Sequence, residues 1–252
     1  MTISKGVLAN PNQPFSPNHS PTISYNSAGK SLEPKDFHFD NHGKKVHCDQ
    51  SKSTSWNGGV LSIKYSPGEN TCYVTTNASL SQLYGGNMPH SGVISAMIEV
   101  DGNSSDDSDA WPAFWMDDTD PGWPQGGEID IAERQYSYTE SHLIGTPGKE
   151  VFGKSMINFG QGGQGLKLED GSHQYQLRWS YIQDKLQLST YVDGHQVGSS
   201  VTLPDSADQD QQQTAQAILD HFKDMHIKFD TDAHKNINSL KYEMKISNVT
   251  VS

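Results

Sequence analysis

Three carboxylic acids lie within the short segment EIDIAE at residues 128–133. Glu128 and Asp130 alternate with isoleucines, a pattern that predicts a strand with acids on one face and apolar side chains on the other. Simple alternation puts Glu133 on the apolar face. A β-bulge at Ala132 absorbs one residue and returns Glu133 to the acidic face, and bulges recur beside active sites.

Two acids placed in this way are suited to the cleavage of a glycosidic bond. With one residue absorbed, the Cα atoms of Glu128 and Glu133 are about 13 Å apart along the strand. Side chains that lean together on a concave sheet bring the carboxyls to about 5–5.5 Å, the separation in retaining glycosidases. That reaction needs one ionised and one protonated carboxyl, and crowded like charges raise the pKa of at least one. Asp130, between them, can hydrogen-bond the nucleophile.

The same three acids also fit a solvated strand face, which is the commoner role of exposed acids. The preceding run WPAFWM at residues 111–116 favours chemistry, because Trp111 and Trp115 share parity and both rings can lie on one face. Sugar rings present C–H faces that need flat apolar platforms, while carboxylates take the hydroxyls. A Trp pair in a strand is more often core. Together with the acids, we interpret the pair as part of a carbohydrate site.

The elements around this site are short strands separated by glycine-containing turns. Strict alternation of apolar residues occurs at 175–179 and 240–246, among other runs. Only residues 208–225 show helical spacing. This pattern predicts an all-β fold with one short helix near 208–225, either a sandwich of two curved antiparallel sheets or a β-jelly-roll.

The ends of the chain differ in composition. Residues 1–33 are rich in Pro, Ser and Asn and predict an extended N-terminal arm, whereas residues 34–252 predict one jelly-roll catalytic domain. The opening residues contain no apolar segment typical of a signal peptide. Cys48 and Cys72 either form one disulfide or remain buried thiols.

The charge of the chain limits its partners. Thirty acidic and eighteen basic side chains among 252 residues give a net charge of −12. A surface of this sign repels nucleic acid, anionic membranes and polyanionic sugars. We therefore expect a neutral partner, no nucleic-acid or membrane partner, and a monomer.

The run WPAFWM followed by GWPQGGEIDIAE resembles the signature of glycoside hydrolase family 16, the retaining jelly-roll endoglycanases that include laminarinases. The E-x-D-x-x-E spacing is similar to that of the laminarinase and agarase branch. The resemblance extends over most of residues 56–252, through the hairpin SHQYQLRWSYIQDKLQLSTYVDG and the closing strand LKYEMKISNVTVS.

This resemblance implies a role for each site residue. Glu128 is the nucleophile, Asp130 its assisting partner and Glu133 the general acid/base. Trp115 lines the subsite next to the scissile bond, and three further residues complete the implied substrate-binding set: Trp111, Trp123 and His142. His142 fits a family histidine that faces the acid, and it fits an exposed strand histidine equally well.

The resemblance implies a retaining endo-acting hydrolase of a neutral β-linked polysaccharide, β-1,3-glucan or mixed-linkage β-1,3-1,4-glucan, working through a glycosyl-enzyme intermediate. A transglycosylase and a non-catalytic glucan-binding module share the fold, but modules have lost the glutamates present here. No cofactor is required. The acidic segments 106–109 and 117–120 could ligate a structural calcium, although solvated loop tips are the commoner role of such segments. A polysaccharide substrate implies secretion.

Overall fold

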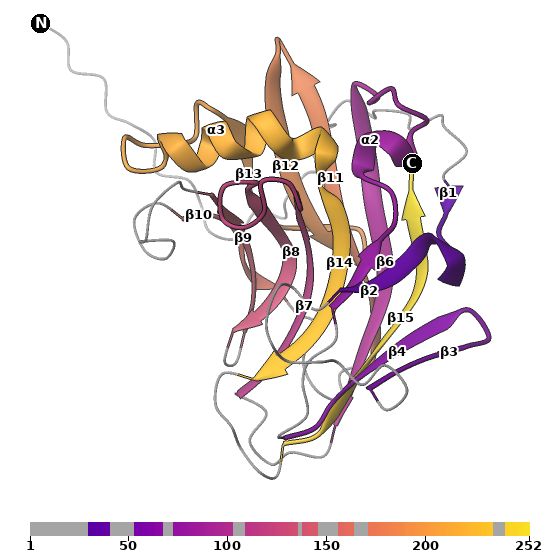
Figure 1. Cartoon of the computed structure of the whole chain (residues 1–252). Helices are drawn as coiled ribbons and strands as arrows, with labels where there is room; N and C mark the ends of the chain where they lie inside the picture. Colours follow the sequence, from indigo (N-terminus) through magenta and orange to yellow (C-terminus); the bar gives the residue numbers. More distant parts are fainter. Residues whose placement is uncertain are drawn as a thin grey trace, which may run out of the picture.

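The computed structural model describes residues 30–40, 53–67, 73–102, 109–135, 138–145, 156–163, 171–233 and 240–252. These residues form two antiparallel β-sheets that pack face to face (Figure 1). The all-β sandwich with one short helix that the sequence predicts is therefore confirmed. Residues 1–29 of the predicted arm, Cys48 and Cys72 lie outside the described residues.

The site is built on the sheet with strand order β10-β9-β8-β7-β14-β5-β2. In that order its strands are β10 (Ile157–Gly163), β9 (Tyr138–Ile144), β8 (Glu128–Gln135), β7 (Ala110–Asp117), β14 (His226–Ala233), β5 (Tyr73–Thr76) and β2 (Phe37–Asp40). Strand β8 thus lies inside the sheet, between β9 and β7.

The second sheet packs against the buried face of the first. Its strand order is β13-β12-β11-β6-β15-β4-β3, with β1 also paired to β15. Its strands are β13 (His195–Leu203), β12 (Lys185–Val192), β11 (Ser172–Ile182), β6 (Ser91–Gly102), β15 (Tyr242–Val251), β4 (Val60–Tyr65), β3 (Thr54–Asn57) and β1 (Lys30–Ser31). The last residues of the predicted arm are therefore a short strand of this sheet, because β1 pairs with the end of β15.

Alternation along the strands determines which face of each sheet is buried. Phe114 and Met116 of β7 and Ile129 of β8 are fully buried and belong to the same cluster as Leu177 and Trp179 of β11 in the other sheet. Their neighbours along β7 and β8 must point to the opposite side. We call this opposite, outward side of the β7–β8–β14 sheet the cleft face.

Helix α3 (Gln212–His221), continued by the 3-10 turn η3 (Phe222–Asp224), confirms the helix predicted at 208–225. It begins later than predicted because the Asp208 carboxylate accepts hydrogen bonds from the backbone N–H groups of Asp210 and Gln211, at 3.0 and 3.1 Å, and holds a turn there. Thr214 donates its hydroxyl to the Gly145 carbonyl at 2.5 Å, which anchors the helix at the end of β9.

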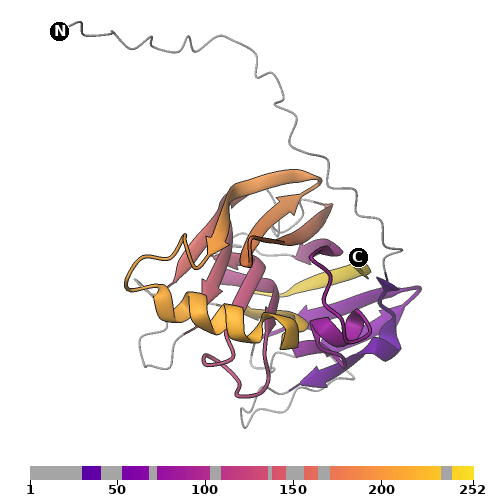
Figure 2. The ribbon, with the colours of Figure 1, turned by 90° about the horizontal axis from the view of Figure 1, so that it is seen from above.

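Two short helical elements were missed from the sequence: α2 (Leu80–Leu83) and the 3-10 turn η1 (Pro34–Asp36). The signal for α2 was the Ser79-x-x-Gln82 spacing, since the Gln82 side chain accepts the Ser79 backbone N–H at 2.9 Å. Helices α2 and α3 lie at the same end of the sandwich (Figure 2). Among the described residues, no helix is long and apolar enough to span a bilayer.

Candidate active site

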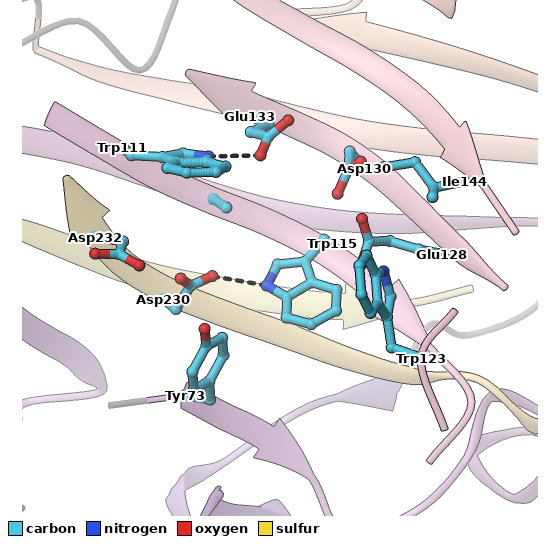
Figure 3. Close-up of a pocket in the computed structure, with 11 residues that line it drawn as sticks. Tyr73, Trp111, Trp115, Trp123, Glu128, Asp130, Glu133, Ile144, Asp230 and Asp232 are labelled. Carbon is cyan, nitrogen blue, oxygen red and sulfur yellow. Dashed lines mark hydrogen bonds between the residues drawn. The ribbon is translucent and has the colours of Figure 1, made fainter. Parts of the chain in front are cut away.

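The cleft face contains a cavity of about 370 Å³. Its walls come from β5, β7, β8, β9 and β14 and from the segment between β7 and β8, and are formed by Tyr73, Trp111, Ala113, Trp115, Trp123, Glu128, Asp130, Glu133, Ile144, Asp230 and Asp232. Figure 3 shows the side chains that line it. The three predicted acids and all three predicted tryptophans therefore meet in one cavity.

The sequence predicts a β-bulge at Ala132 that brings Glu133 to this face, and the structure has that bulge one residue earlier, at Ile131. The register of β8 against β9 shifts between Asp130 and Glu133. Against β7, Ala132 and Asp130 face consecutive residues, so Ile131 is the extra residue. The Ser141 hydroxyl donates to the Ile131 carbonyl at 2.8 Å and satisfies a backbone group at the bulge. Glu133 therefore lines the cavity instead of pointing into the core between the sheets.

Glu128 and Asp130 are neighbouring acids on the cleft face. Burial raises the pKa of Glu128, the negative charge of Glu133 raises it further, and the charge of Lys228 lowers it. Burial raises the pKa of Asp130, and the negative charges of Glu128 and Glu133 raise it further. Asp130 is only 3% exposed whereas Glu128 is half-buried against the cavity. Burial therefore favours the neutral form of Asp130 more than that of Glu128.

A buried ion pair lies beside Glu128. Lys228 Nζ is 2.6 Å from Asp117 Oδ1, with both side chains 1% exposed, and it lies 4.8 Å from the centre of the Trp115 ring. Asp117 is the cross-strand partner of Glu128. We expected residues 117–120 to form a solvated loop tip. That expectation is wrong for Asp117, which ends β7 and neutralises the buried Lys228.

The three tryptophans occupy different depths of the cavity. Trp111 donates its indole N–H to Glu133 Oε1 at 2.5 Å, so it contacts the predicted acid/base directly. Trp115 is 6% exposed and donates its N–H to Asp230 Oδ1 at 2.7 Å, which makes it part of the cavity floor. Trp123 is 37% exposed and lies beside Glu128 (Figure 3). Trp123 is the ring that can best present a face to a sugar.

His142 lies behind Glu133 on β9. Its Nε2 is 3.7 Å from Glu133 Oε2 and 2.8 Å from Glu140 Oε2, and its Nδ1 is 2.5 Å from Asn158 Oδ1. The side chain is 0% exposed. The prediction of an exposed strand histidine is therefore wrong, and His142 faces Glu133 instead. Because its side chain is fully buried and is not among the residues that line the cavity, it does not fit the substrate-binding set either.

Five residues of the site were missed from the sequence. Tyr73 of β5 and Asp230 and Asp232 of β14 line the cavity, Lys228 lies beneath it, and Glu140 lies behind it. The signal on β14 was the alternation of charged residues at 228, 230 and 232, which puts all three on one face. Burial raises the pKa of Asp230, and the Trp115 N–H acts in the opposite direction.

The two acidic segments considered for calcium do not form a metal site in the described part of the chain, where no group of three His, Cys, Asp or Glu is arranged to hold an ion. Asp117 pairs with Lys228, and Asp118 Oδ2 is 2.8 Å from His221 Nδ1. Residues 106–108 lie outside the described residues. The described acids at 117–120 therefore do not fit a calcium site.

No family model and no curated protein matches the sequence. Solved structures match the fold. An endo-1,3-β-glucanase from Streptomyces sioyaensis superposes with a TM-score of 0.62 at 18% identity, over 88% of this chain and 90% of that chain. The laminarinase catalytic domain from Thermotoga maritima gives 0.57 at 15% identity, over 87% and 92%.

A family 16 glycoside hydrolase of a mixed-linkage glucan system from Bacteroides ovatus, in complex with a glucan product, gives a TM-score of 0.55 at 17% identity, over 88% of this chain and 96% of that chain. The three structures are each matched along most of their length. At such identities the similarity establishes the architecture. The chain has the jelly-roll fold of family 16 β-glucanases.

Proposed function

We propose that this protein is a retaining, endo-acting glycoside hydrolase of family 16 that cleaves a neutral β-linked glucan, either β-1,3-glucan or mixed-linkage β-1,3-1,4-glucan. The observation that carries the proposal is that Glu128 and Glu133 line one cavity on one face of β8. The spacing of positions 128 and 133 would put the two glutamates on opposite faces of a regular strand. The bulge at Ile131 brings both to the same face.

The two carboxyls divide the chemistry between them. Glu128 attacks the anomeric carbon while Glu133 donates its proton to the glycosidic oxygen, so the C–O bond breaks and a glycosyl-enzyme ester forms. Water then attacks the same carbon and gives a proton to Glu133, which releases Glu128 with the original configuration restored. Asp130 is the assisting acid beside Glu128 on the same face of β8. The reaction needs no cofactor.

The lining of the cavity supports a neutral substrate. Five carboxyl groups line it, and no lysine or arginine is among its lining residues in the described part of the chain. A sulfated or uronic-acid polymer would be repelled from such a site. Aromatic rings from three tryptophans and Tyr73 supply the apolar surface that sugar rings need.

Two other functions share the fold. Glucan binding alone does not need a second glutamate in the cavity, and therefore does not need the bulge that places it there. We rank a glucan-binding module below hydrolysis. A transglycosylase differs only in the acceptor that attacks the intermediate. Because a polymeric substrate is cleaved where it is found, we propose that the protein acts outside the cell as a monomer.

Substitution of each acid, followed by rescue with azide, tests the proposal. Glu128→Ala should abolish hydrolysis, and azide should restore turnover of an activated aryl glycoside with an inverted glycosyl azide as product. Glu133→Ala should still form the intermediate, and azide should give the product of retained configuration. Swapped outcomes would reverse the two roles. Inversion by the unmodified enzyme would reject the mechanism.

A further inference from the structure

The segment between β7 and β8 is a loop whose two ends touch each other. We call residues 118–127 the Trp123 loop. A Cβ added at Gly126 would lie 2.5 Å from the carbonyl oxygen of Asp118, so a glycine is needed where the two ends meet. Asp118, Gly126 and Gly127 are buried, whereas Trp123 is exposed and lines the cavity. The loop therefore has a buried base and an exposed tip that carries a ring able to face a sugar.

Helix α3 packs directly against this base. The helix crosses the end of the sheet at which β8 begins and β9 ends (Figure 1). A Cβ added at Gly127 would lie 3.0 Å from Ile218 Cδ1 and 3.4 Å from the carbonyl carbon of Ala217. A Cβ added at Gly145, which follows β9, would lie 2.9 Å from Ala217 Cβ. Two glycines thus let α3 approach the backbone just before Glu128.

One side-chain contact joins α3 to the first half of the Trp123 loop. His221 Nδ1, at the end of α3, lies 2.8 Å from Asp118 Oδ2. A carboxylate only accepts hydrogen bonds, so the histidine nitrogen is the donor. The other oxygen of the same carboxylate, Asp118 Oδ1, accepts the backbone N–H of Asp120 at 3.0 Å. A single carboxylate therefore links the helix to the backbone of the loop, and His221 fixes its orientation.

The second half of the Trp123 loop is shaped by its own backbone. The Gly126 N–H donates to the Gly122 carbonyl at 2.7 Å, and the Gly127 N–H donates to the Pro124 carbonyl at 3.1 Å. These two bonds form the turn that carries Trp123, but both lie inside the loop and do not fix the turn relative to the cavity. That placement comes from the base, where the loop packs on α3 and is bonded to it through the carboxylate.

We propose that His221 is a positioning residue that holds the Trp123 loop, through Asp118, so that the Trp123 ring lies beside Glu128 before substrate binds (Figure 3). This inference rests on the proposed function. A side chain that is already in place loses less conformational entropy on binding than one that must first be ordered. Loss of the donor at position 221 should therefore weaken the binding of a glucan.

The proposed nucleophile does not depend on this contact. Glu128 is the cross-strand partner of Asp117 in β7 and of Ile144 in β9, so backbone pairing on both sides holds it in place. Loss of the donor at position 221 should thus raise KM and spare kcat. A defect of folding alone would instead reduce the amount of active enzyme, and so lower the apparent kcat while KM stays the same.

The test replaces His221 by residues with and without a donor. His221→Ala and His221→Phe remove the donor, without and with the volume of a ring, and should raise KM for a soluble β-1,3-glucan by about fivefold. Their kcat should stay within about twofold of the unmodified enzyme, and His221→Asn, whose amide N–H can replace Nδ1–H, should restore KM to within about twofold. His173→Phe is the matched control, because His173 Nδ1 lies 2.6 Å from Asp193 Oδ2 in the other sheet, and it should alter neither constant. An unchanged KM in a folded variant without the donor, or an equal rise in His221→Asn, would overturn the inference.

A ¹⁹F NMR spectrum of the protein labelled with 5-fluorotryptophan separates this inference from the proposed function, because it needs no substrate. Trp123→Phe identifies the signal of Trp123. That signal should be single and narrow in the unmodified protein and should shift in His221→Ala, while the signal of the buried Trp179 stays in place. A doubled or broadened Trp123 signal in the unmodified protein refutes the inference even if no variant at position 221 folds. If the unmodified protein cleaves no β-glucan, the proposed function fails, and the Trp123 signal alone decides whether His221 positions the loop.

Discussion

Substitution of Lys228 by methionine tests whether the buried cation is required to keep Glu128 ionised. Lys228 Nζ is 2.6 Å from Asp117 Oδ1, both side chains are 1% exposed, and the charge of Lys228 lowers the pKa of Glu128. Methionine fills a similar volume without charge. The substitution leaves Asp117 buried without its cation, which costs about 3–5 kcal/mol of folding free energy.

The same substitution should change the pH profile in a direction set by the electrostatics. Glu128 must be ionised to attack, so its pKa governs the acidic limb of kcat/KM. Removal of a neighbouring positive charge raises that pKa, and the acidic limb should move to higher pH by about one unit. Activity is thus lost first at low pH, where the unmodified enzyme still works.

The double variant Asp117→Asn/Lys228→Met supplies the control. The charge of Asp117 raises the pKa of Glu128 and that of Lys228 lowers it, so removal of both should return the acidic limb towards its original position. Most of the lost stability should also return, because no unpaired charge remains buried. Urea denaturation and pH–rate profiles of the three proteins measure both effects. A folded Lys228→Met protein with an unmoved acidic limb would refute the reasoning.

Two further substitutions test the floor and the bulge of the site. Trp115→Ala removes a ring that is 6% exposed, and urea denaturation should show a loss of roughly 3–5 kcal/mol; a loss near zero would contradict its place in the floor. Ser141→Ala removes the hydroxyl that donates to the Ile131 carbonyl, and should lower the free energy of unfolding by about 1–3 kcal/mol. It should also lower kcat more than it changes KM, because Glu133 loses its orientation. Exposed Ser199→Ala is the matched control, and unchanged kcat in Ser141→Ala would show that the bulge does not depend on this bond.

The acids of β8 could be predicted from the sequence because everything needed to place them is local. Glu128, Asp130 and Glu133 lie on one strand, and the two isoleucines between them fix the buried face. A bulge was then the only local change that could bring Glu133 to the same face as the other two. The same holds for α3, whose buried residues Ala215 and Ile218 follow helical spacing.

Lys228 and Asp230 could not be predicted in the same way, because their importance depends on which strand borders β7. That neighbour is β14, more than a hundred residues later in the chain, and the pairing places Lys228 opposite Trp115. Periodicity shows which residues of a strand share a face and does not show which strand lies beside it. The register of β9 is equally non-local, so parity alone could not show that Glu140 faces Glu133.

The cleft face carries more acids than the proposed double displacement uses, and several of the acids contact an N–H donor. Three acids each contact a donor N–H: Glu133 contacts Trp111, Asp230 contacts Trp115 and Asp117 contacts Lys228. Donors of this kind stabilise a carboxylate whose hydration is lost on burial. The arrangement explains how one strand face can hold so many acids without unfolding the sheet.

The surroundings of Glu128 differ from those of the other acids, and the difference supports its proposed role as the nucleophile. Its neighbour on the cleft face is a second carboxyl, Asp130, which is buried more deeply, so that burial favours its neutral form more strongly. A half-buried carboxylate that lines the cavity keeps lone pairs available to a substrate. Glu133, by contrast, is enclosed by the Trp111 N–H and by His142, groups that can follow a change in its charge. The acid proposed to attack is thus the accessible one, and the acid proposed to exchange a proton is enclosed by Trp111 and His142.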